Sequence, residues 1–458
     1  MPPKHHPGDR RADATIDVNP LYSSPGMDNV PKNRLPAGSM SADIAYQIVH
    51  DELLLDGNAR TNLATFVTTW MEPQGKRLMA ECADKNMIDK DEYPRTADLE
   101  QRCVRMLADL WHASPEDSIG CSALGSSEAC MLGGLALKRR WQKRTGGEGK
   151  PNLVMGANVQ VVWEKFCEYW DVEARLVPVV EGRHHLDGPS AVEHCDENTI
   201  GVVAILGSTY DGAYEPVAEI AAALDEFQER TGNDVPIHVD GASGAFVAPF
   251  IDPGLLWDFR VDRVASINAS GHKYGLVYPG VGWVIWRDRD ALPKELIFDV
   301  DYLGGHMPTF TLNFSRPGSQ IAAQYYNLIR LGFDGYRAVQ QESRDVAKLT
   351  ARAIGELEPF ELLSDGSELP VFAFKLRDDI DAYTVFDVSD QLRASGWIVP
   401  AYKFPKNLEH VQLLRVVVRN GFSQDLAELF LADVRAIIPK LERQSQPLAV
   451  EDATSFHH

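Results

Sequence analysis

Cysteines are few in this sequence of 458 residues, and their spacing shows no pairing pattern. The six cysteines include no CxxC pair, and none follows Cys195, so neither a zinc site nor a disulfide framework is expected. No apolar run approaches the roughly 20 residues that a membrane-spanning helix needs. The start of the chain lacks the apolar segment of a secretory signal. We therefore expect a cytoplasmic protein with reduced thiols and no membrane span.

Positive charge is also scarce. The 45 Lys and Arg residues face 66 Asp and Glu residues, which gives a formal net charge of −21. Such an acidic balance argues against nucleic acid and anionic membranes as partners, since both need a basic surface. The hydrophobic share of 44% and the charged share of 24% are typical of an ordinary globular protein.

Strands and helices alternate through the middle of the chain, which predicts an α/β fold with a doubly wound, mostly parallel sheet. The expected strands are 152–155, 201–206, 236–239, 263–267 and 281–286, and the expected helices are 45–55, 97–111, 126–143, 158–169 and 217–231. Strands 370–376, 397–404 and 412–418 with helices 383–395 and 424–441 predict a smaller α/β domain. The expected division is an N-terminal arm (1–55), a large domain (56–345), a small domain (346–443) and a tail (444–458).

The segment SINASGHKYG, residues 266–275, is the most informative about chemistry. Lys273 follows a predicted buried strand and stands among small and hydroxyl residues. An amine there can form a Schiff base if burial or a nearby cation lowers its pKa. The glycines and serines would let backbone and hydroxyl groups approach a phosphate closely. A solvated lysine in an ordinary loop is the alternative that this segment leaves open.

Two further segments bear on that choice. PIHVDGASGAF, residues 236–246, predicts a strand that ends at Asp240, at the sheet edge where α/β proteins bind ligands. Its carboxylate could keep a pyridinium nitrogen protonated, or it could cap a turn. Gly125, Ser126 and Ser127 precede a predicted helix, whose start can bind phosphate, although a plain serine cap has the same pattern. The sequence contains no GxxxxGK[ST] motif and no convincing GxGxxG motif, so it gives no support to a nucleotide-binding site.

Taken in order, these three segments resemble the fold-type I pyridoxal phosphate enzymes. Within them the chain is most similar to the group II decarboxylases, and above all to glutamate decarboxylases of bacterial type. The likeness runs from about residue 45 to the C-terminus. The shared phrases are DGNARTNLATF (56–66), GSSEACMLGG (125–134), CDENTIGVV (195–203), SGHKYG (270–275), GWVIWRD (282–288) and VDYLGG (300–305).

The resemblance implies pyridoxal 5'-phosphate as the cofactor, no metal, and a set of cofactor-binding residues. Lys273 would hold the cofactor as a Schiff base, and Asp240 would pair with the pyridinium nitrogen. Gln160 would lie over the ring, Ala242 beneath it, and Thr209 beside its phenolic oxygen or the substrate carboxylate. The phosphate would be held by Ser126, Ser127, Ser270 and His272, while Phe314 and Ser315 would reach the phosphate of the neighbouring subunit.

The implied reaction is the decarboxylation of L-glutamate to 4-aminobutyrate and CO2, with uptake of one proton. Arg415 would bind the α-carboxylate, with Arg419 as the alternative. The pocket for the distal carboxylate would be formed by Thr65, Phe66, Asn86 and Asp89. An aspartate beside an anionic substrate requires that one of the two carboxyl groups be protonated, because close like charges raise one pKa. An acidic activity optimum is therefore expected.

Other implied roles concern proton transfer and closure of the site. Tyr302, in the sequence DYLGGH, or a histidine would protonate Cα; alternatively, Tyr302 would only close the site. His458 or His457 in the terminal TSFHH would block the site when neutral and release it in acid, since histidine titrates in that range. A frayed tail without a role is the alternative.

The roles of Phe314 and Ser315 imply at least a homodimer. A hexamer stays open, because the N-terminal arm is rich in proline and histidine, unlike the bacterial pattern. A basic, Trp-bearing C-terminal helix is absent, so no calmodulin site is expected.

Two other functions stay open on the sequence. One is a different pyridoxal phosphate activity: an aminotransferase, or a decarboxylase of aspartate or aromatic amino acids. The segment TNLATF and Asp89 argue against an aromatic pocket. The other is a catalytically silent homologue, and the presence together of Lys273, Asp240 and Arg415 argues against that.

Overall fold

The computed structural model describes residues 32–114, 116–300, 307–444 and 446–448. The chain divides into two compact units, Met1–Asn58 and Ala59–His458. In the described part of the first unit, α1 (Ala42–Leu53) is a helix without a buried residue. Among the described residues, no helix has the length and apolar character to cross a membrane. Tyr302, His457 and His458 lie outside the described residues, so their roles stay predictions.

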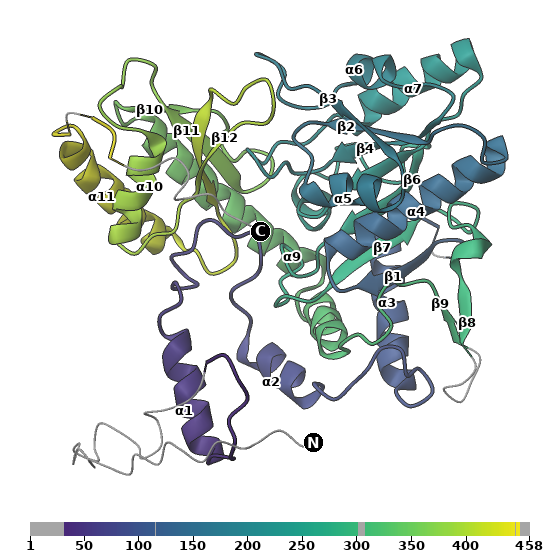
Figure 1. The fold of residues 1–458 in the computed structure, drawn as a ribbon, viewed down its shortest axis with the longest axis horizontal. Helices are drawn as coiled ribbons and strands as arrows, with labels where there is room; N and C mark the ends of the chain where they lie inside the picture. The colour runs from purple at the N-terminus through teal and green to yellow at the C-terminus, as the bar shows by residue number, and fades with distance from the viewer. Residues whose placement is uncertain (1–31, 115, 301–306, 445, 449–458) are drawn as a thin grey trace, which may run out of the picture. The chain divides into compact units, whose positions relative to one another are not determined.

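The second unit is built on a seven-stranded sheet with helices on both faces (Figure 1). The strand order is β1-β7-β6-β5-β4-β2-β3, and β7 alone runs against its neighbours. The strands are β1 (Ile119–Ala123), β2 (Asn152–Gly156), β3 (Glu173–Val177), β4 (Thr199–Ile205), β5 (Ile237–Asp240), β6 (Val264–Ala269) and β7 (Gly282–Trp286). Every residue of β2, β4, β5, β6 and β7 is buried, as expected for strands covered on both faces. The predicted fold class is confirmed.

Successive strand residues point to opposite faces, and each face has its own core. Leu153 packs with α4 (Ser126–Thr145) and α5 (Val161–Tyr169) on one face. Val154, the next residue, packs in the core of the other face. That second core also receives side chains from α3 (Pro94–Leu110), α6 (Gly188–Glu193), α7 (Val217–Thr231), α8 (Ala248–Ile251) and the first part of α9 (Ser319–Gly355). The sheet is therefore the middle of three layers.

A second, smaller sheet follows α9 in the chain. Its order is β10-β11-β13-β12, all antiparallel. The strands β10 (Phe360–Leu362), β11 (Val371–Leu376), β12 (Ala401–Lys403) and β13 (Gln412–Val417) share a core with α10 (Val385–Ala394), α11 (Gln424–Leu441) and the end of α9. The two sheets fall on either side of the domain boundary expected at residue 345, which lies inside α9. The domain limits themselves stay predictions.

Helix α9 was not predicted, because a glycine interrupts its pattern. Gly332 has φ 58° and ψ −168°, a left-handed conformation that divides the helix into two pieces. The first piece packs against α2 (Pro73–Glu81) and α3 and adds side chains to the core of the large sheet. The second piece begins in that same core at Tyr336 and joins the core of the small sheet from Val346 onward. Successive parts of α9 thus face two different cores. The helix therefore lacks the single continuous apolar stripe by which a helix is detected in a sequence.

Strands β1 and β3 of the large sheet were not predicted, and most other expected elements differ from the structure by a few residues at one or both ends. Two of these differences have a clear local cause. The strand expected at 397–404 is only β12, Ala401–Lys403, because Ile398 pairs instead with Thr61 and Leu63 through backbone hydrogen bonds, and Pro400 has no N–H to donate. The helix expected from residue 158 begins at Val161, since the Gln160 side chain accepts from Val162 N at 2.6 Å and caps it.

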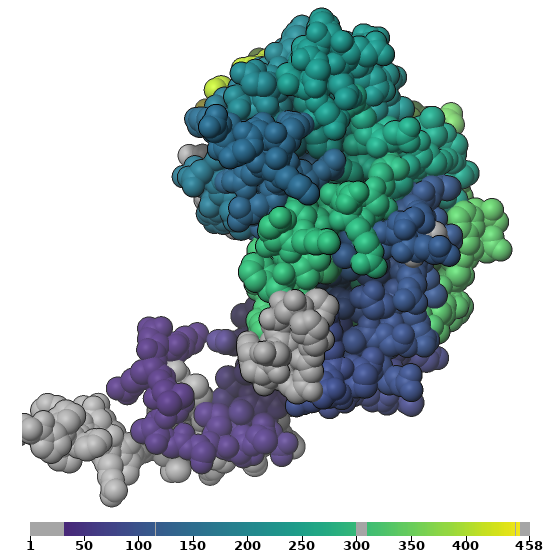
Figure 2. All heavy atoms as spheres, turned by 90° about the vertical axis from the view of Figure 1, so that its right-hand side faces the viewer, coloured from purple at the N-terminus to yellow at the C-terminus, as the bar shows by residue number. Residues whose placement is uncertain are grey.

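The segment after β7 shares a small core with β1, β7 and α4. In Figure 2 it lies in green beside the blue of the earlier elements. It contains the hairpin of β8 (Phe298–Val300) and β9 (Met307–Thr309). Phe310 packs edge-on against Trp286, with ring centroids 5.7 Å apart. Asn313 N, a little further on, donates to Glu128 at 3.0 Å. The segment is thereby fastened beside the start of α4.

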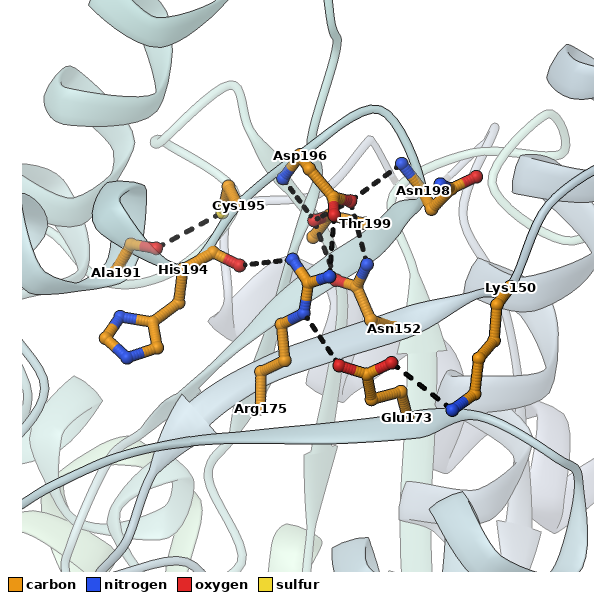
Figure 3. Close-up of polar contacts among 10 residues, drawn as sticks. All are labelled: Lys150, Asn152, Glu173, Arg175, Ala191, His194, Cys195, Asp196, Asn198 and Thr199. Atoms are coloured by element: carbon orange, nitrogen blue, oxygen red, sulfur yellow. Dashed lines mark hydrogen bonds and ion pairs between the residues drawn. The ribbon is translucent and has the colours of Figure 1, made fainter.

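The CDENTIG phrase forms a polar network at the amino ends of β2, β3 and β4 (Figure 3). Asp196 accepts hydrogen bonds from Asn152 Nδ2 at 2.8 Å and from Arg175 Nη2 at 2.6 Å. Thr199 Oγ1 donates to Asn152 Oδ1 at 2.8 Å. Burial raises the pKa of Asp196, but these bonds and the Arg175 charge bring it below its ordinary value. The CDENTIG segment therefore links β2, β3 and β4 at their amino ends, away from the carboxyl ends of these strands.

Replacing Asp196 by alanine is expected to lower the free energy of unfolding by about 2–4 kcal/mol, because Asn152 Nδ2 and Arg175 Nη2 each lose the acceptor to which they donate. Urea denaturation at pH 7 measures this loss. The lowered pKa means that Asp196 stabilises the fold above its unfolded pKa, near 4, and loses this effect as the pH falls. Wild type and variant should therefore converge in acid. Glu197→Ala, at the exposed neighbour, is the control, and an equal loss there would contradict the prediction.

Candidate active site

A cavity of about 520 Å³ lies at the carboxyl ends of β4, β5 and β6 and at the start of α4. Its size is typical of small-molecule sites, and its place is that expected for a ligand in an α/β sheet. Nine of the eleven residues expected at the cofactor line it, namely Ser126, Ser127, Gln160, Thr209, Asp240, Ala242, Ser270, His272 and Lys273.

One end of the cavity has the groups that bind an anion. Helix α4 begins after Gly125 without a side-chain cap, so its first N–H groups and its dipole face this end. Ser126 Oγ lies 2.5 Å from Ser270 Oγ, which brings two hydroxyls together. Gly282 lets β7 approach this turn, since a Cβ there would lie 2.4 Å from the Gly125 carbonyl carbon. The arrangement suits a phosphate.

His272 adds a donor to the same end. Its Nδ1 accepts from the backbone N–H groups of Gly280 and Val281, both at 3.3 Å. The neutral ring therefore carries its proton on Nε2. Burial, together with the Lys273 cation, lowers the pKa of His272 to about 4. The ring is thus neutral above this pH and offers one N–H.

Lys273 lies in the middle of the cavity wall. Its Nζ is 3.5 Å from Ser243 Oγ and 5.2 Å from the centroid of the Phe66 ring. Burial lowers the pKa of Lys273, while Asp240 partly opposes the shift. A lower pKa leaves more of the amine unprotonated near neutral pH, which is the form that attacks a carbonyl carbon.

Asp240 is buried at the end of β5 and accepts from four donors. Trp163 Nε1 donates to Oδ2 at 2.8 Å, and Cys130 Sγ lies 3.7 Å from the same oxygen. Asn268 Nδ2 and the Ala242 N–H donate to Oδ1 at 3.0 and 3.1 Å. All four groups donate, so both carboxylate oxygens act as acceptors. The cavity therefore has a fixed negative charge in its wall.

Of the two arginine candidates, Arg415 lies near the other expected groups. Its guanidinium donates to the carbonyl oxygens of Thr209 at 2.5 Å and Ala64 at 2.7 Å, and it stacks 4.7 Å from the Phe66 ring centroid. Arg419 instead donates to Ala59 O and Thr69 Oγ1, and burial lowers its pKa to about 10. Neither arginine lines the cavity.

Six other expected residues also lie outside the cavity walls: Thr65, Phe66, Asn86, Asp89, Phe314 and Ser315. Two of them, assigned to different pockets by the sequence, meet here. Asn86 Nδ2 donates to Ser315 Oγ at 3.3 Å, and Asn86 Oδ1 accepts from Arg316 N at 3.1 Å. Hydrogen bonds therefore hold the segment of Asn86 and the segment of Ser315 together.

Sequence reasoning missed several groups around the site. Asn158 and Ser243 line the cavity, and Trp163 and Asn268 donate to Asp240. The importance of Asn268 could have been inferred from the sequence, because a buried amide inside an otherwise apolar strand needs a hydrogen-bond partner. That of Trp163 could not, because an apolar helix face does not tell where an indole N–H points.

The loop that carries Thr209 is held by an ion pair between the half-buried His185 and the buried Asp211. His185 Nε2 lies 2.8 Å from Asp211 Oδ2. Burial disfavours the charged imidazole, but the hydrogen bond and charge of Asp211 raise the pKa of His185 above its ordinary value. The pair therefore forms between a cation and an anion at mildly acidic pH.

Replacing His185 by glutamine is expected to remove a pH-dependent part of the stability. Because the folded pKa is raised, His185 stabilises the fold fully below its unfolded pKa near 6.5 and loses this effect as the pH rises through the folded value. The melting temperature of the wild type should exceed that of the variant at pH 5.5, by an amount that corresponds to about 1–3 kcal/mol, and the gap should narrow towards pH 8.5. His410→Gln, at an exposed histidine, is the control. A constant gap would contradict the assignment.

Comparison with known proteins now identifies the family. The family model described as "Pyridoxal-dependent decarboxylase conserved domain" matches residues 36–377. The chain belongs to the pyridoxal-dependent decarboxylase family.

Several members of this family are close relatives. A glutamate decarboxylase of Aliivibrio fischeri is 51% identical, with 91% of this chain and 92% of that protein covered. One from Solanum lycopersicum is 52% identical, with coverages of 91% and 84%. The solved glutamate decarboxylase of Lactobacillus brevis is 47% identical with a TM-score of 0.89, over 92% of this chain and 97% of that one. A tryptophan decarboxylase of Catharanthus roseus shares only the fold, at 16% identity and a TM-score of 0.76.

The cofactor of this family, pyridoxal phosphate, fits the cavity. It needs an amine for its aldehyde, an acid for its ring nitrogen and a cradle for its phosphate. Lys273 supplies the amine and Asp240 an ionised carboxylate. The start of α4, with Ser126, Ser270 and His272, supplies donors for the phosphate.

Proposed function

We propose that this protein is a glutamate decarboxylase, which converts L-glutamate to 4-aminobutyrate and CO2 with uptake of one proton. The observation that carries the proposal is the identity of about one half to proteins named glutamate decarboxylase, over more than nine tenths of this chain. The cavity supports it, because an amine, an ionised carboxylate and an anion cradle meet there.

When bound, pyridoxal phosphate supplies an electron sink for the pair released by the Cα–carboxylate bond. The chain prepares this chemistry in three ways. Lys273 offers a partly unprotonated amine to hold the cofactor covalently. Asp240 would keep a proton on the ring nitrogen, and its four donors hold the carboxylate in place for this role. Gln160 and Ala242 line the cavity where the two faces of the ring would lie.

Substrate binding is assigned to Arg415 and the Phe66 segment. The guanidinium of Arg415 donates to two carbonyl oxygens, those of Thr209 and Ala64. Its buried Nε has no hydrogen-bond partner among the described residues. Such a donor suits the α-carboxylate. Thr65 and Phe66 lie on the adjoining segment and face the distal carboxylate. With Asp89 in that pocket, activity is expected to be highest in acid, where one of the two carboxyl groups is protonated.

The assembly that we propose is at least a homodimer. Phe314 and Ser315 would reach the phosphate of the neighbouring subunit, and the hydrogen bond of Ser315 with Asn86 supports a place for the distal-carboxylate segment near the same interface. The six unpaired thiols suit a reducing compartment such as the cytoplasm. Tyr302 as proton donor or lid, and His458 or His457 as a pH-dependent block, complete the proposal.

Product analysis with the purified protein and added pyridoxal phosphate tests the function. Glutamate, aspartate and tryptophan are supplied separately from pH 4 to pH 8, and CO2 and amines are measured. We expect 4-aminobutyrate from glutamate, with the highest rate in acid, and no amine from the other two. Protein without added cofactor is the blank. Amine from tryptophan or aspartate alone, or a keto acid in place of CO2, would overturn the proposal.

A further inference from the structure

Behind Asp240 lies a column of buried polar side chains that the reaction does not use directly. The parallel strands β5 and β6 pair His238 with Ser266 and Asp240 with Asn268. His238 and Asp240 are two residues apart, so they point to the same face of the sheet. The exposed fractions of His238, Ser266 and Asn268 are 0%, 1% and 0%. A polar column so deep in an apolar core needs an explanation.

Helices α4 and α5 pack closely against the His238 imidazole. A Cβ on Gly133 of α4 would lie 2.4 Å from His238 Cε1, so only glycine lets the helix pass. The Trp163 ring of α5 packs edge-on to the imidazole at 5.0 Å, and its Nε1 donates to Asp240. The imidazole therefore has one place and one orientation.

The hydrogen bonds of the column can run in one direction only. The ionised Asp240 only accepts, so the group 3.0 Å from its Oδ1 is the amide NH2 of Asn268. Asn268 Oδ1 must then accept, at 2.7 Å, from His238 Nε2–H. The other ring nitrogen, Nδ1, is left as an acceptor for the Ser266 hydroxyl at 2.7 Å. Each donor points towards the next residue, from Ser266 to Asp240.

This direction matters because Asn268 is the donor with the most freedom. The Ala242 N–H belongs to the backbone, and the Trp163 indole is held by packing in a core. The Asn268 amide can rotate, and a rotated amide would place its oxygen against the carboxylate. The bond from His238 Nε2–H gives Asn268 Oδ1 a partner and so provides a second anchor. Burial favours the neutral ring, since it lowers the pKa of His238.

We propose that His238 is a positioning residue for Asp240: its neutral ring, protonated on Nε2, holds Asn268 so that the amide NH2 faces the carboxylate. The inference rests on the role proposed for Asp240, namely to keep the ring nitrogen of the cofactor protonated. His238 itself touches neither substrate nor cofactor. It acts through Asn268 on the charge and position of Asp240.

Two substitutions separate this role from simple packing. His238→Gln places an amide nitrogen where Nε2 lies and can still donate to Asn268. His238→Asn places its amide near Nδ1 and can reach only Ser266. We expect the Asn variant to lose about 10- to 100-fold in kcat, the range seen when a supporting hydrogen-bond partner of a site is removed. The KM for glutamate should change less than threefold, and the Gln variant should recover most of kcat.

Two measurements do not depend on turnover. The dissociation constant of pyridoxal 5'-phosphate, from equilibrium dialysis, should rise in the Asn variant and stay close to wild type in the Gln variant. NMR of 15N-histidine-labelled wild type, with and without cofactor, should show His238 neutral and protonated on Nε2 from pH 5 to pH 8. This spectrum needs no variant, so it stands even if His238→Asn does not fold.

The outcomes are distinct. A cationic His238, or one protonated on Nδ1, would overturn the inference, as would equal kcat and cofactor affinity in the Gln and Asn variants. If the wild type does not decarboxylate glutamate, the proposed function fails, while the NMR spectrum and the cofactor affinities still test the inference. Near-equal melting temperatures of the two variants would confirm that the comparison reports on position and not on folding.

Discussion

Alanine at position 273 is expected to reduce kcat/KM for glutamate by at least about 10³-fold, because a group that acts covalently has no substitute in the site. Lys273 is half-buried, its amine faces the cavity beside Phe66, and burial lowers its pKa. The loss should appear in kcat more than in binding, since the phosphate cradle is untouched. Initial rates of CO2 release measure it.

Two further results would make this assignment specific. A small primary amine such as methylamine, added to the Lys273→Ala variant, should restore part of the rate, because it replaces the missing amine but not a missing fold. Lys165→Ala, at an exposed lysine of α5, is the matched control and should keep the wild-type rate. A Lys273→Ala variant with more than a tenth of wild-type kcat would remove Lys273 from its role.

Replacing Asp240 by asparagine is expected to have the next largest effect, a fall in kcat on the order of 10²- to 10⁴-fold. The change keeps the size of the side chain but removes its charge. The new amide NH2 would also face donors, since Trp163, Asn268 and the Ala242 N–H all point at this position. A ring nitrogen without an anionic partner loses its proton and with it the ability to take up electrons.

The measurement pairs steady-state rates with cofactor affinity. The dissociation constant of pyridoxal 5'-phosphate should rise less than kcat falls, because the phosphate donors at the start of α4 remain. Asp262→Asn, at an exposed residue just before β6, controls for a general loss of negative charge. Full activity of Asp240→Asn would show that another group keeps the ring nitrogen protonated.

Much of the wall of the cavity could be predicted from the sequence, because its residues lie in short, continuous segments. Ser126 and Ser127 open a helix, Asp240 ends a strand, and Ser270, His272 and Lys273 share one turn. In each case a local rule places the group at the sheet edge where ligands bind. The cavity brings all of these residues together.

The substrate side could not be predicted in the same way. Arg415 reaches Thr209 and Ala64 from the small sheet, across 206 and 351 positions of the chain. No local pattern specifies such a contact. The resemblance placed Asn86 beside Thr65 and Phe66, whereas the structure also joins Asn86 to Ser315.

The sequence by itself determined the class of fold, five of the seven strands of the large sheet and nine of the residues that line the cavity, because periodicity, capping and strand-end chemistry act over a few residues. Only the tertiary structure decided how those residues are supported. The four donors to Asp240 come from two helices, a turn and a neighbouring strand, and the direction of the column from Ser266 through His238 depends on which acceptor each donor meets. Hydrogen-bond direction is a property of groups in contact, and contacts between distant segments exist only once the chain has folded.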